Sequence, residues 1–243
     1  MVDASISFIL VVVIALIVGG IFLVIDYANK KNYESSHYYQ ETRKPYDTIV
    51  HNKGAWGEYQ TFSALANVIT SSSCILYNLY IPTKDGKITE VDAVLITPQG
   101  LFVLENKNFS GWIFGDANQR YWCQTLRSSR GCEKHRFYNP IWQNGGHIRS
   151  LRSLLGETVP FYSIVTFSNR CTFKKLNTTG ANAYVVYASA LPNLVANLQA
   201  TKPVCLSPTA IATICQTLYP YTHASEQTKL AHHIQVQQKR QEF

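Results

Sequence analysis

The longest apolar stretch of the chain lies near its start, where residues 6–25 include no charged side chain. An apolar helix of this length crosses the hydrocarbon layer of a bilayer. A cleaved signal peptide would begin with basic residues and end at small ones. Here the only charged residue before the apolar segment is Asp3, and the segment ends at Ile25-Asp26-Tyr27. The pattern therefore predicts a transmembrane anchor over residues 1–28.

Basic residues follow this anchor directly. Lys30 and Lys31 come first, and Arg43 and Lys44 lie a little further along. Because basic residues are enriched on the cytoplasmic side of membrane helices, we expect a single-pass protein with its N-terminus outside and its soluble domain in the cytoplasm. The polar, tyrosine-rich residues 29–52 are typical of a juxtamembrane linker, or of a short helix without a core of its own.

Two apolar runs separated by a turn form the centre of the chain. In residues 91–97 one set of positions, Val91, Ala93, Leu95 and Thr97, alternates with a second set, Asp92, Val94 and Ile96. Residues 101–104 are continuously apolar, and both runs are typical of buried strands. Between them stands Pro98-Gln99-Gly100, in which proline presets the first turn position and glycine accepts the strained last one. The pattern predicts a β-hairpin.

The length of this turn determines which residues of the two strands face each other. With a two-residue loop Thr97 pairs with Gly100 and Asp92 lies opposite Glu105, whereas a bulge at Gly100 would shift the register by one residue. Facing Cβ atoms are about 4.5–5.5 Å apart, so one small hard cation can bridge the two carboxylates. Lys107 lies two residues beyond Glu105 and therefore on the same face of the strand.

Two helical patterns add further candidates. Glu58 lies in the first turn of the first pattern, where the helix dipole alone explains an acidic residue. A second helix begins at Asn139-Pro140, with proline in its first turn. Within it Gln143 and His147 are four residues apart and share a face. A glutamine near a helix start that faces a metal site could orient water or phosphate.

The remaining segments alternate between strand and helix. Residues 111–114 and 119–126 are strand-like and either extend the central sheet or form a flap beside it. Further strands are predicted at residues 74–81, 162–167 and 183–187, and helices near 191–199, 208–218 and 226–240. This order predicts an α/β fold with a mixed sheet flanked by helices. Neither GxGxxG nor GxxxxGK is present, which argues against a dehydrogenase or a nucleotide-driven motor.

The charge balance is basic. Lys and Arg number 22 against 15 Asp and Glu, which gives a net charge of +7 and favours an anionic partner, either nucleic acid or an acidic lipid surface. Much of the excess positive charge lies between residues 120 and 152, where Glu133 is the only opposing acidic residue. Aromatic residues interleaved with these charges suit base stacking, although aromatics at such spacing also form cores. The candidate nucleic-acid-binding residues are Arg120, Arg127, Arg130, Lys134, Arg136, Arg149 and Arg152.

The six cysteines include no CxxC pair, and a chain of 243 residues with 46% hydrophobic residues can form a sizeable core without covalent cross-links. We therefore expect reduced thiols, in agreement with a cytoplasmic domain. Cys123, Cys132 and His135 lack the fourth ligand and the paired spacing of a zinc site.

Five blocks in a fixed order resemble the nuclease-related domain, called NERD. They are GAWGE at 54–58, EVD at 90–92, TPQG at 97–100, VLENKNFSG at 103–111 and YNPIWQN at 138–144. The resemblance covers residues 53–155, and residues 156–243 are expected to continue the same domain. The family is similar to PD-(D/E)xK nucleases, which implies a restriction-endonuclease-like mixed sheet and a site that uses Mg²⁺ or Mn²⁺.

The resemblance also implies roles for individual residues. Asp92 and Glu105 would be metal ligands, with Glu58 as an additional acidic ligand. Lys107 would activate or orient the attacking water, and Gln143 would be an auxiliary catalytic residue. The block at 103–111 has asparagine at position 106, where relatives often carry a small or hydroxyl residue, and this side chain should face away from the metal.

Two functions are compatible with these observations. The first is a membrane-anchored, metal-dependent nuclease that hydrolyses phosphodiester bonds, with DNA favoured over RNA as the substrate. The second is a catalytically inactive, membrane-tethered protein that binds nucleic acid or acts as a scaffold, because nuclease folds are also reused as binding modules. No protein partner is indicated by the sequence.

Overall fold

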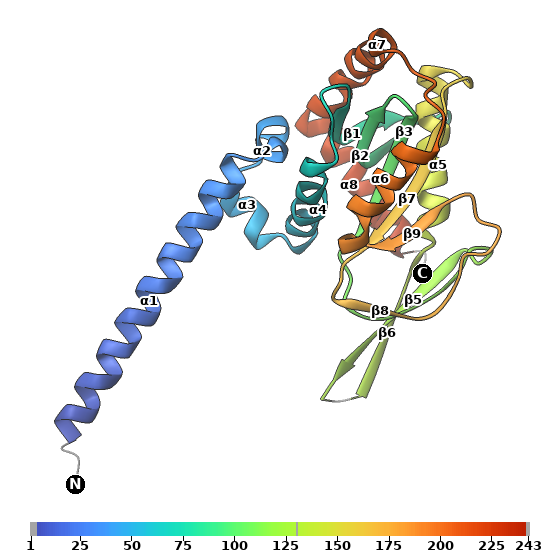
Figure 1. The fold of residues 1–243 in the computed structure, drawn as a ribbon. Helices are drawn as coiled ribbons and strands as arrows, with labels where there is room; N and C mark the ends of the chain where they lie inside the picture. Colours follow the sequence, from blue (N-terminus) through green and yellow to red (C-terminus); the bar gives the residue numbers. More distant parts are fainter. Residues whose placement is uncertain (1–3, 130, 242–243) are drawn as a thin grey trace.

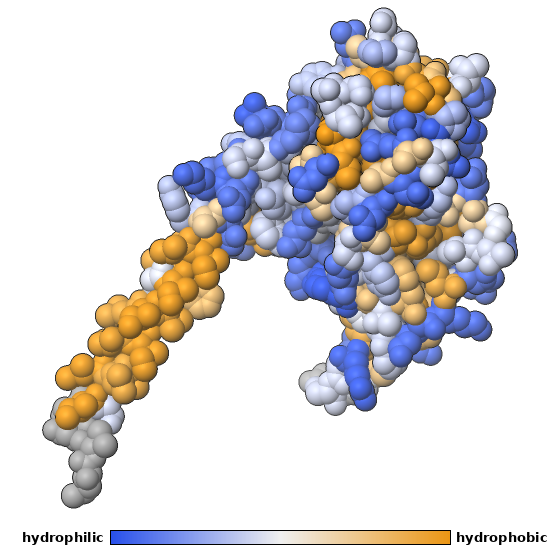
Figure 2. Space-filling model, viewed as in Figure 1, coloured by the Kyte–Doolittle hydropathy of each residue, from blue (hydrophilic) through white to orange (hydrophobic). Residues whose placement is uncertain are grey.

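The computed structural model of the protein describes residues 4–129 and 131–241, so the candidate Arg130 lies outside the described residues (Figure 1). A long helix, α1 (Ala4–Glu34), projects from an α/β body. Its side chains form a continuous apolar surface along most of its length (Figure 2). As the sequence predicted, α1 is long and apolar enough to cross a membrane.

The body is built on a five-stranded mixed sheet with the strand order β1-β2-β3-β7-β9. Strands β1, β2 and β3 are antiparallel to one another, and β7 and β9 continue the sheet in parallel with β3. This arrangement confirms the predicted fold class. The strand bounds are β1 (Cys74–Pro82), β2 (Ile88–Thr97), β3 (Gly100–Lys107), β7 (Phe161–Phe167) and β9 (Tyr184–Tyr187).

Helices cover both faces of this sheet. On one face, α4 (Lys53–Ser63) and α6 (Leu191–Thr201) contribute apolar side chains to the core around Ala93 and Leu95. On the other, α5 (Pro140–Leu155) and α7 (Pro208–Leu218) pack against Val94, Ile96 and Val103. The remaining elements beside the sheet are α8 (Glu226–Gln241) and the 3₁₀ turns η1 (Ala64–Asn67), η2 (Ala188–Ala190) and η3 (Tyr219–His223).

The central hairpin has the predicted register. Thr97 pairs with Gly100 and the ladder continues to Ala93 opposite Leu104, with no bulge between them. Gly100 has a φ of 131°, and a Cβ atom there would lie 2.6 Å from the carbonyl oxygen of Pro160. Only glycine meets both conditions, since other residues are strained at this φ and would collide with the backbone.

The regular alternation of β1 and β2 breaks at one point. Asn78 has a φ of 52° in the middle of β1. Tyr77 belongs to the core on the α4 side, whereas Leu79 and Val91 belong to the core on the α5 side. A residue in the left-handed region interrupts the regular pleat, so that side chains two positions apart point to opposite faces of the sheet. The break lies beside Asp92.

A second, four-stranded sheet with the order β6-β5-β4-β8 packs beside the first. It settles the alternatives left for residues 111–126, since these strands belong to a separate sheet and do not extend the central one. Its hairpin of β5 and β6 projects from the body (Figure 1). The bounds are β4 (Gly111–Asp116), β5 (Tyr121–Ser128), β6 (Gly131–Tyr138) and β8 (Cys171–Asn177), of which β6 and β8 were not predicted.

Most of residues 29–52 are helical. After the end of α1 come α2 (His37–Thr42) and α3 (Tyr46–His51). The side chains of Tyr33, Tyr38 and Ile49 are at most 1% exposed and belong to the core on the α4 side of the sheet. The segment therefore has no core of its own but shares that of the domain, because its tyrosines pack against one another and against α4.

The expectation of reduced thiols is wrong for two of the six cysteines. Cys74 at the start of β1 and Cys215 in α7 form a disulfide bond across a sequence separation of 141 residues. Both lie against the same apolar core, which brings their sulfur atoms together. The other four cysteines have free thiols.

Candidate active site

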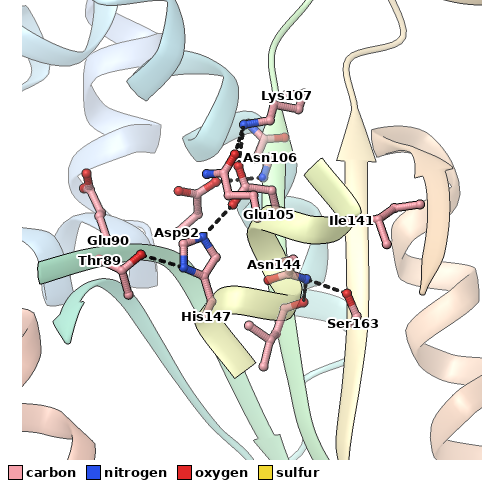
Figure 3. A network of polar contacts seen from close by, with 12 residues as sticks. Thr89, Glu90, Asp92, Glu105, Asn106, Lys107, Ile141, Asn144, His147 and Ser163 are labelled. Atoms are coloured by element: carbon pink, nitrogen blue, oxygen red, sulfur yellow. Dashed lines mark hydrogen bonds and ion pairs between the residues drawn. The ribbon is translucent and has the colours of Figure 1, made fainter. Parts of the chain in front are cut away.

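Asp92, Glu105 and Lys107 lie near one another on the neighbouring strands β2 and β3, with His147 of α5 beside them (Figure 3). Asp92 comes from β2, Glu105 and Lys107 from the end of β3, and Gln143 and His147 from the first turns of α5. α5 begins here because the Asn139 side chain accepts a hydrogen bond from the Ile141 amide, with proline as the first helical residue.

Glu105 is the centre of this group, and its side chain is almost fully buried, with 1% of the residue exposed. Lys107 Nζ lies 2.5 Å from Glu105 Oε1 and also donates to Gln143 Oε1 at 3.0 Å. His147 Nε2 lies 3.1 Å from Glu105 Oε2. Both carboxylate oxygens of Glu105 thus have a partner, and the ammonium group of Lys107 is fixed between two oxygens.

Asp92 is held by the backbone of the neighbouring strand. The Asn106 amide N–H donates to Asp92 Oδ2 at 2.7 Å. The Asn106 side chain lies toward the other face of the sheet, where its Oδ1 accepts hydrogen bonds from Thr61 of α4 and Thr166 of β7. Asparagine at this position therefore does not crowd the side of the strand that carries Glu105 and Lys107.

The two carboxyl groups differ in their electrostatics. Burial raises the pKa of Asp92 well above its ordinary value, and the nearby Glu105 and Glu58 carboxyls raise it further. Burial also acts to raise the pKa of Glu105, but Lys107 and His147 together bring it below the ordinary value. Opposite shifts of neighbouring carboxyl groups are frequent at catalytic sites, where two acids have different tasks.

Sequence reasoning did not assign a role to His147. This side chain is 3% exposed, and its Nδ1 lies 2.9 Å from Thr89 Oγ1 of β2 while its Nε2 contacts Glu105. Since an ionised carboxylate only accepts hydrogen bonds, Nε2 is the donor of that pair. The signal in the sequence was the spacing of four residues from Gln143, which places both side chains on the site-facing side of α5.

Glu58 is near the site but has its own partners. Its Oε2 accepts hydrogen bonds from Tyr38 at 3.4 Å and from Asn78 at 3.3 Å. Burial raises the pKa of Glu58, and the positive charge of Lys44 opposes this. Within residues 4–129 and 131–241, no group of three or more His, Cys, Asp or Glu side chains is arranged to hold a metal ion. Glu58, Asp92 and Glu105 are therefore not preassembled as a group of three carboxylates, and the role of Glu58 as an additional ligand stays a prediction.

The candidate nucleic-acid-binding residues fall into two groups. Arg120, Arg127, Lys134 and Arg136 accompany the β5–β6 hairpin and are exposed, with Arg136 over the ring of Tyr121 at 4.8 Å. Arg149 and Arg152 lie on α5 instead, at the other end of the predicted stretch. The structure therefore separates a hairpin group from a helix group.

The family match bears on the fold of this mixed sheet. Residues 53–168 match the family model of the nuclease-related domain, NERD, and over this stretch the chain belongs to that family. The match extends past the expected end at residue 155 to include β7, the parallel neighbour of β3.

One curated relative is an uncharacterised protein of Bacillus anthracis. It is 30% identical over 143 residues, which cover 59% of this chain and 66% of the relative. The chain thus spans about two thirds of the length of that protein.

Proposed function

We propose that the protein is a membrane-anchored, metal-dependent nuclease that hydrolyses phosphodiester bonds in nucleic acid, with DNA favoured over RNA. One observation carries the proposal. Asp92, Glu105 and Lys107 lie together on neighbouring strands of a nuclease-related domain, and α5 adds Gln143 and His147 to them. Such a set contains the acidic ligands and the cation that phosphodiester hydrolysis requires.

The chemistry of the donor set fits Mg²⁺ or Mn²⁺. Asp92 and Glu105 offer carboxylate oxygens, which hard divalent cations prefer, and no thiolate takes part. Burial and the neighbouring Glu105 and Glu58 carboxyls raise the pKa of Asp92, and a bound cation would oppose this effect. Asp92 and Glu105 would hold the ion, with Glu58 as the nearest further carboxylate. A bound ion would neutralise phosphate charge and lower the pKa of a water molecule.

The remaining side chains have positioning tasks in this proposal. Lys107 Nζ uses two of its donors on Glu105 and Gln143, which leaves a third for the attacking water or for a phosphate oxygen. Thr89 fixes the ring of His147, and His147 in turn fixes the second oxygen of Glu105. In this way α5 and β2 would hold the Glu105 carboxylate in one orientation during the reaction.

A second candidate function is a membrane-tethered protein that binds nucleic acid without cutting it. The observation in its favour is that both oxygens of Glu105 already have protein partners. Among the residues that the structure describes, no third ligand is grouped with the two carboxylates. Such a site would bind phosphate through the basic residues and leave the bond intact.

Cleavage assays on the full-length protein in detergent micelles distinguish the two. Glu105→Gln should lower Mg²⁺-dependent cleavage of DNA by about 100-fold or more, because it removes a ligand, and Lys107→Ala should have a similar effect. DNA affinity should stay equal or rise, since a negative charge near phosphate is lost. Glu226→Gln, in an exposed ion pair with Lys229, is the control.

Each function predicts a different pattern in these measurements. Full cleavage by Glu105→Gln in Mg²⁺ would contradict the nuclease mechanism. A natural protein that binds DNA and never cuts it would support the second candidate.

A further inference from the structure

A pocket of about 520 Å³ opens on the side of α5 that faces away from the carboxylates. Its walls come from the end of β6, the outward face of α5 and the start of β7. The lining includes Tyr138, Trp142, Arg149, Arg152, Phe161 and Ser163. Because Trp142 and Gln143 are adjacent, the first turn of α5 contributes one side chain to the pocket and the next to Lys107.

Aromatic rings with fixed orientations line this pocket. The indole of Trp142 donates from Nε1 to the carbonyl oxygen of Ala117 at 2.8 Å, which holds the ring in place. The Tyr138 ring lies edge-on to it at 6.4 Å between centroids, and both residues are exposed by more than a third. Phe161 completes the aromatic lining. Accessible, immobile rings are the usual stacking partners of unpaired bases.

Two guanidinium groups at the pocket have open donors. Among the residues that the structure describes, Arg149 has no hydrogen-bond or ion-pair partner for its side chain. Arg152 lies over the ring of Phe161 at 5.4 Å, and its Nε is in an ion pair with Glu157 Oε2 at 3.8 Å. In the described part of the chain the terminal Nη groups of Arg152 have no hydrogen-bond partner. The two arginines are three residues apart and therefore on one side of α5. Paired guanidinium groups match the oxygens of a phosphate.

A buried hydroxyl group adds a polar contact at the pocket wall. Ser163 is 6% exposed, and its Oγ accepts a hydrogen bond from Asn144 Nδ2 at 2.9 Å. In the described part of the chain its own proton has no acceptor, so it can donate to a ligand. Stacking surfaces, two phosphate-binding cations and one polar donor together match a nucleotide.

We propose that this pocket binds one nucleotide unit, with its base against Trp142, Tyr138 and Phe161 and its phosphate on Arg149 and Arg152. As part of a strand, that unit would pass the first turn of α5 and bring a neighbouring phosphodiester to Glu105 and Lys107. This second step rests on the proposed nuclease function, whereas the binding of a nucleotide does not. The substrate class is then a nucleic acid with an unpaired base.

Equilibrium binding to the full-length protein in detergent micelles tests this, with EDTA present so that no metal-dependent cleavage occurs. The probes are a fluorescein-labelled single-stranded oligonucleotide and a free nucleoside 5′-monophosphate. Arg149→Ala combined with Arg152→Ala should weaken oligonucleotide binding at least about tenfold and reduce its salt slope by about 0.7 for each lost phosphate contact. Lys84→Ala with Lys87→Ala removes the same charge from a distant exposed turn and is the matched control.

The two probes distinguish the sources of the nucleotide. Weaker binding of both probes by the arginine variant supports a pocket that also accepts free nucleotides, and weaker binding of the oligonucleotide alone supports a strand subsite. Arginine-to-lysine changes at both positions should restore part of the affinity, which a folding defect would not explain.

Affinities equal to those of the natural protein for both probes, or losses no larger than in the lysine control, would overturn the proposal. Failure of both probes to bind the natural protein would do the same. These readings do not depend on cleavage, so full activity of Glu105→Gln would remove the nuclease mechanism and leave them unchanged.

Discussion

Asp92 combines burial with two acidic neighbours, and this makes its charge costly as long as no cation is bound. Its raised pKa means that the folded protein holds this proton more tightly than the unfolded chain does. The contribution of Asp92 to the free energy of unfolding therefore falls as pH rises from the unfolded value through the raised folded value. Above that window the metal-free protein is destabilised by Asp92.

Removing the charge of Asp92 should therefore stabilise the folded protein. Asp92→Asn should stabilise the metal-free protein at neutral pH by about 1 kcal/mol, or about 2–4 °C in Tm, because the repulsion is removed. The gain should disappear at acidic pH, where Asp92 is protonated in both states. Mg²⁺ should raise the Tm of the natural protein and have little effect on the variant. Thermal unfolding with and without Mg²⁺ measures all three effects.

Asp85→Asn is the control for this prediction, because Asp85 lies in an exposed turn. A hydrogen bond from Thr83 and the nearby Lys87 lower its pKa, so its neutralisation should not stabilise the protein. An equal Mg²⁺ response of natural protein and Asp92→Asn would exclude Asp92 as a metal ligand.

For single residues, the sequence predicted the contacts that follow from the two-residue repeat of side chains along a strand. Glu105 and Lys107 could be placed on one face because side chains repeat every second residue, and their ion pair agrees with this. The contact of His147 with Glu105 depends on the rotation of α5 over the sheet, which the spacing within one helix does not fix. Asn78 gave no signal, because a left-handed asparagine in a strand has no distinct pattern in a single sequence.

Among the elements, the β5–β6 hairpin presents most of the candidate phosphate-binding residues. Arg127 and Lys134 are exposed on adjacent strands, and Arg127 is paired with Cys132 near the hairpin end. We expect Arg127→Ala with Lys134→Ala to weaken DNA binding and to lower the salt slope by about one unit for each lost contact. Cleavage at saturating DNA should change little, because the hairpin is separate from the carboxylates.

Filter binding at several salt concentrations, together with cleavage rates at saturating DNA, tests this assignment. Lys84→Ala combined with Lys87→Ala removes two exposed charges outside the hairpin and provides the comparison. An unchanged salt slope in the hairpin variant would place the DNA path elsewhere on the protein.

The elements that the sequence predicted well are those with local signals. The central hairpin follows from a turn of known geometry, and the start of α5 from Asn139-Pro140. β6 was instead interpreted as a basic stretch, since its residues are almost all exposed and show no apolar alternation. Burial of Tyr33 and the bond between Cys74 and Cys215 depend on contacts between distant segments, which no local pattern contains.

For the molecule as a whole, the chain carries its own reporters of orientation in the membrane. Lys30 and Lys31 favour a cytoplasmic domain. The disulfide bond between Cys74 and Cys215 means that reduced thiols no longer support this location. Cys132 and Cys205 are exposed free thiols and serve as reporters. A membrane-impermeant maleimide should leave both unlabelled in intact cells and label both after permeabilisation.

Cys132→Ser with Cys205→Ser should abolish most of the labelling seen after permeabilisation, which identifies the reacting residues. Labelling of the natural protein in intact cells would reverse the proposed orientation.

The join between α1 and the domain limits where the protein can act. Tyr33 is completely buried, and Tyr46 donates a hydrogen bond to Asp26 at 3.0 Å, so the end of α1 is part of the domain and not a tether. Residues 26–34 rise only about 13 Å as a helix. With α1 in a bilayer, this short and rigid connection would hold the domain that carries Asp92 and Glu105 close to the membrane surface. Only polymer segments that come to the membrane surface meet them, so the location of a nucleic acid would select it as strongly as its sequence.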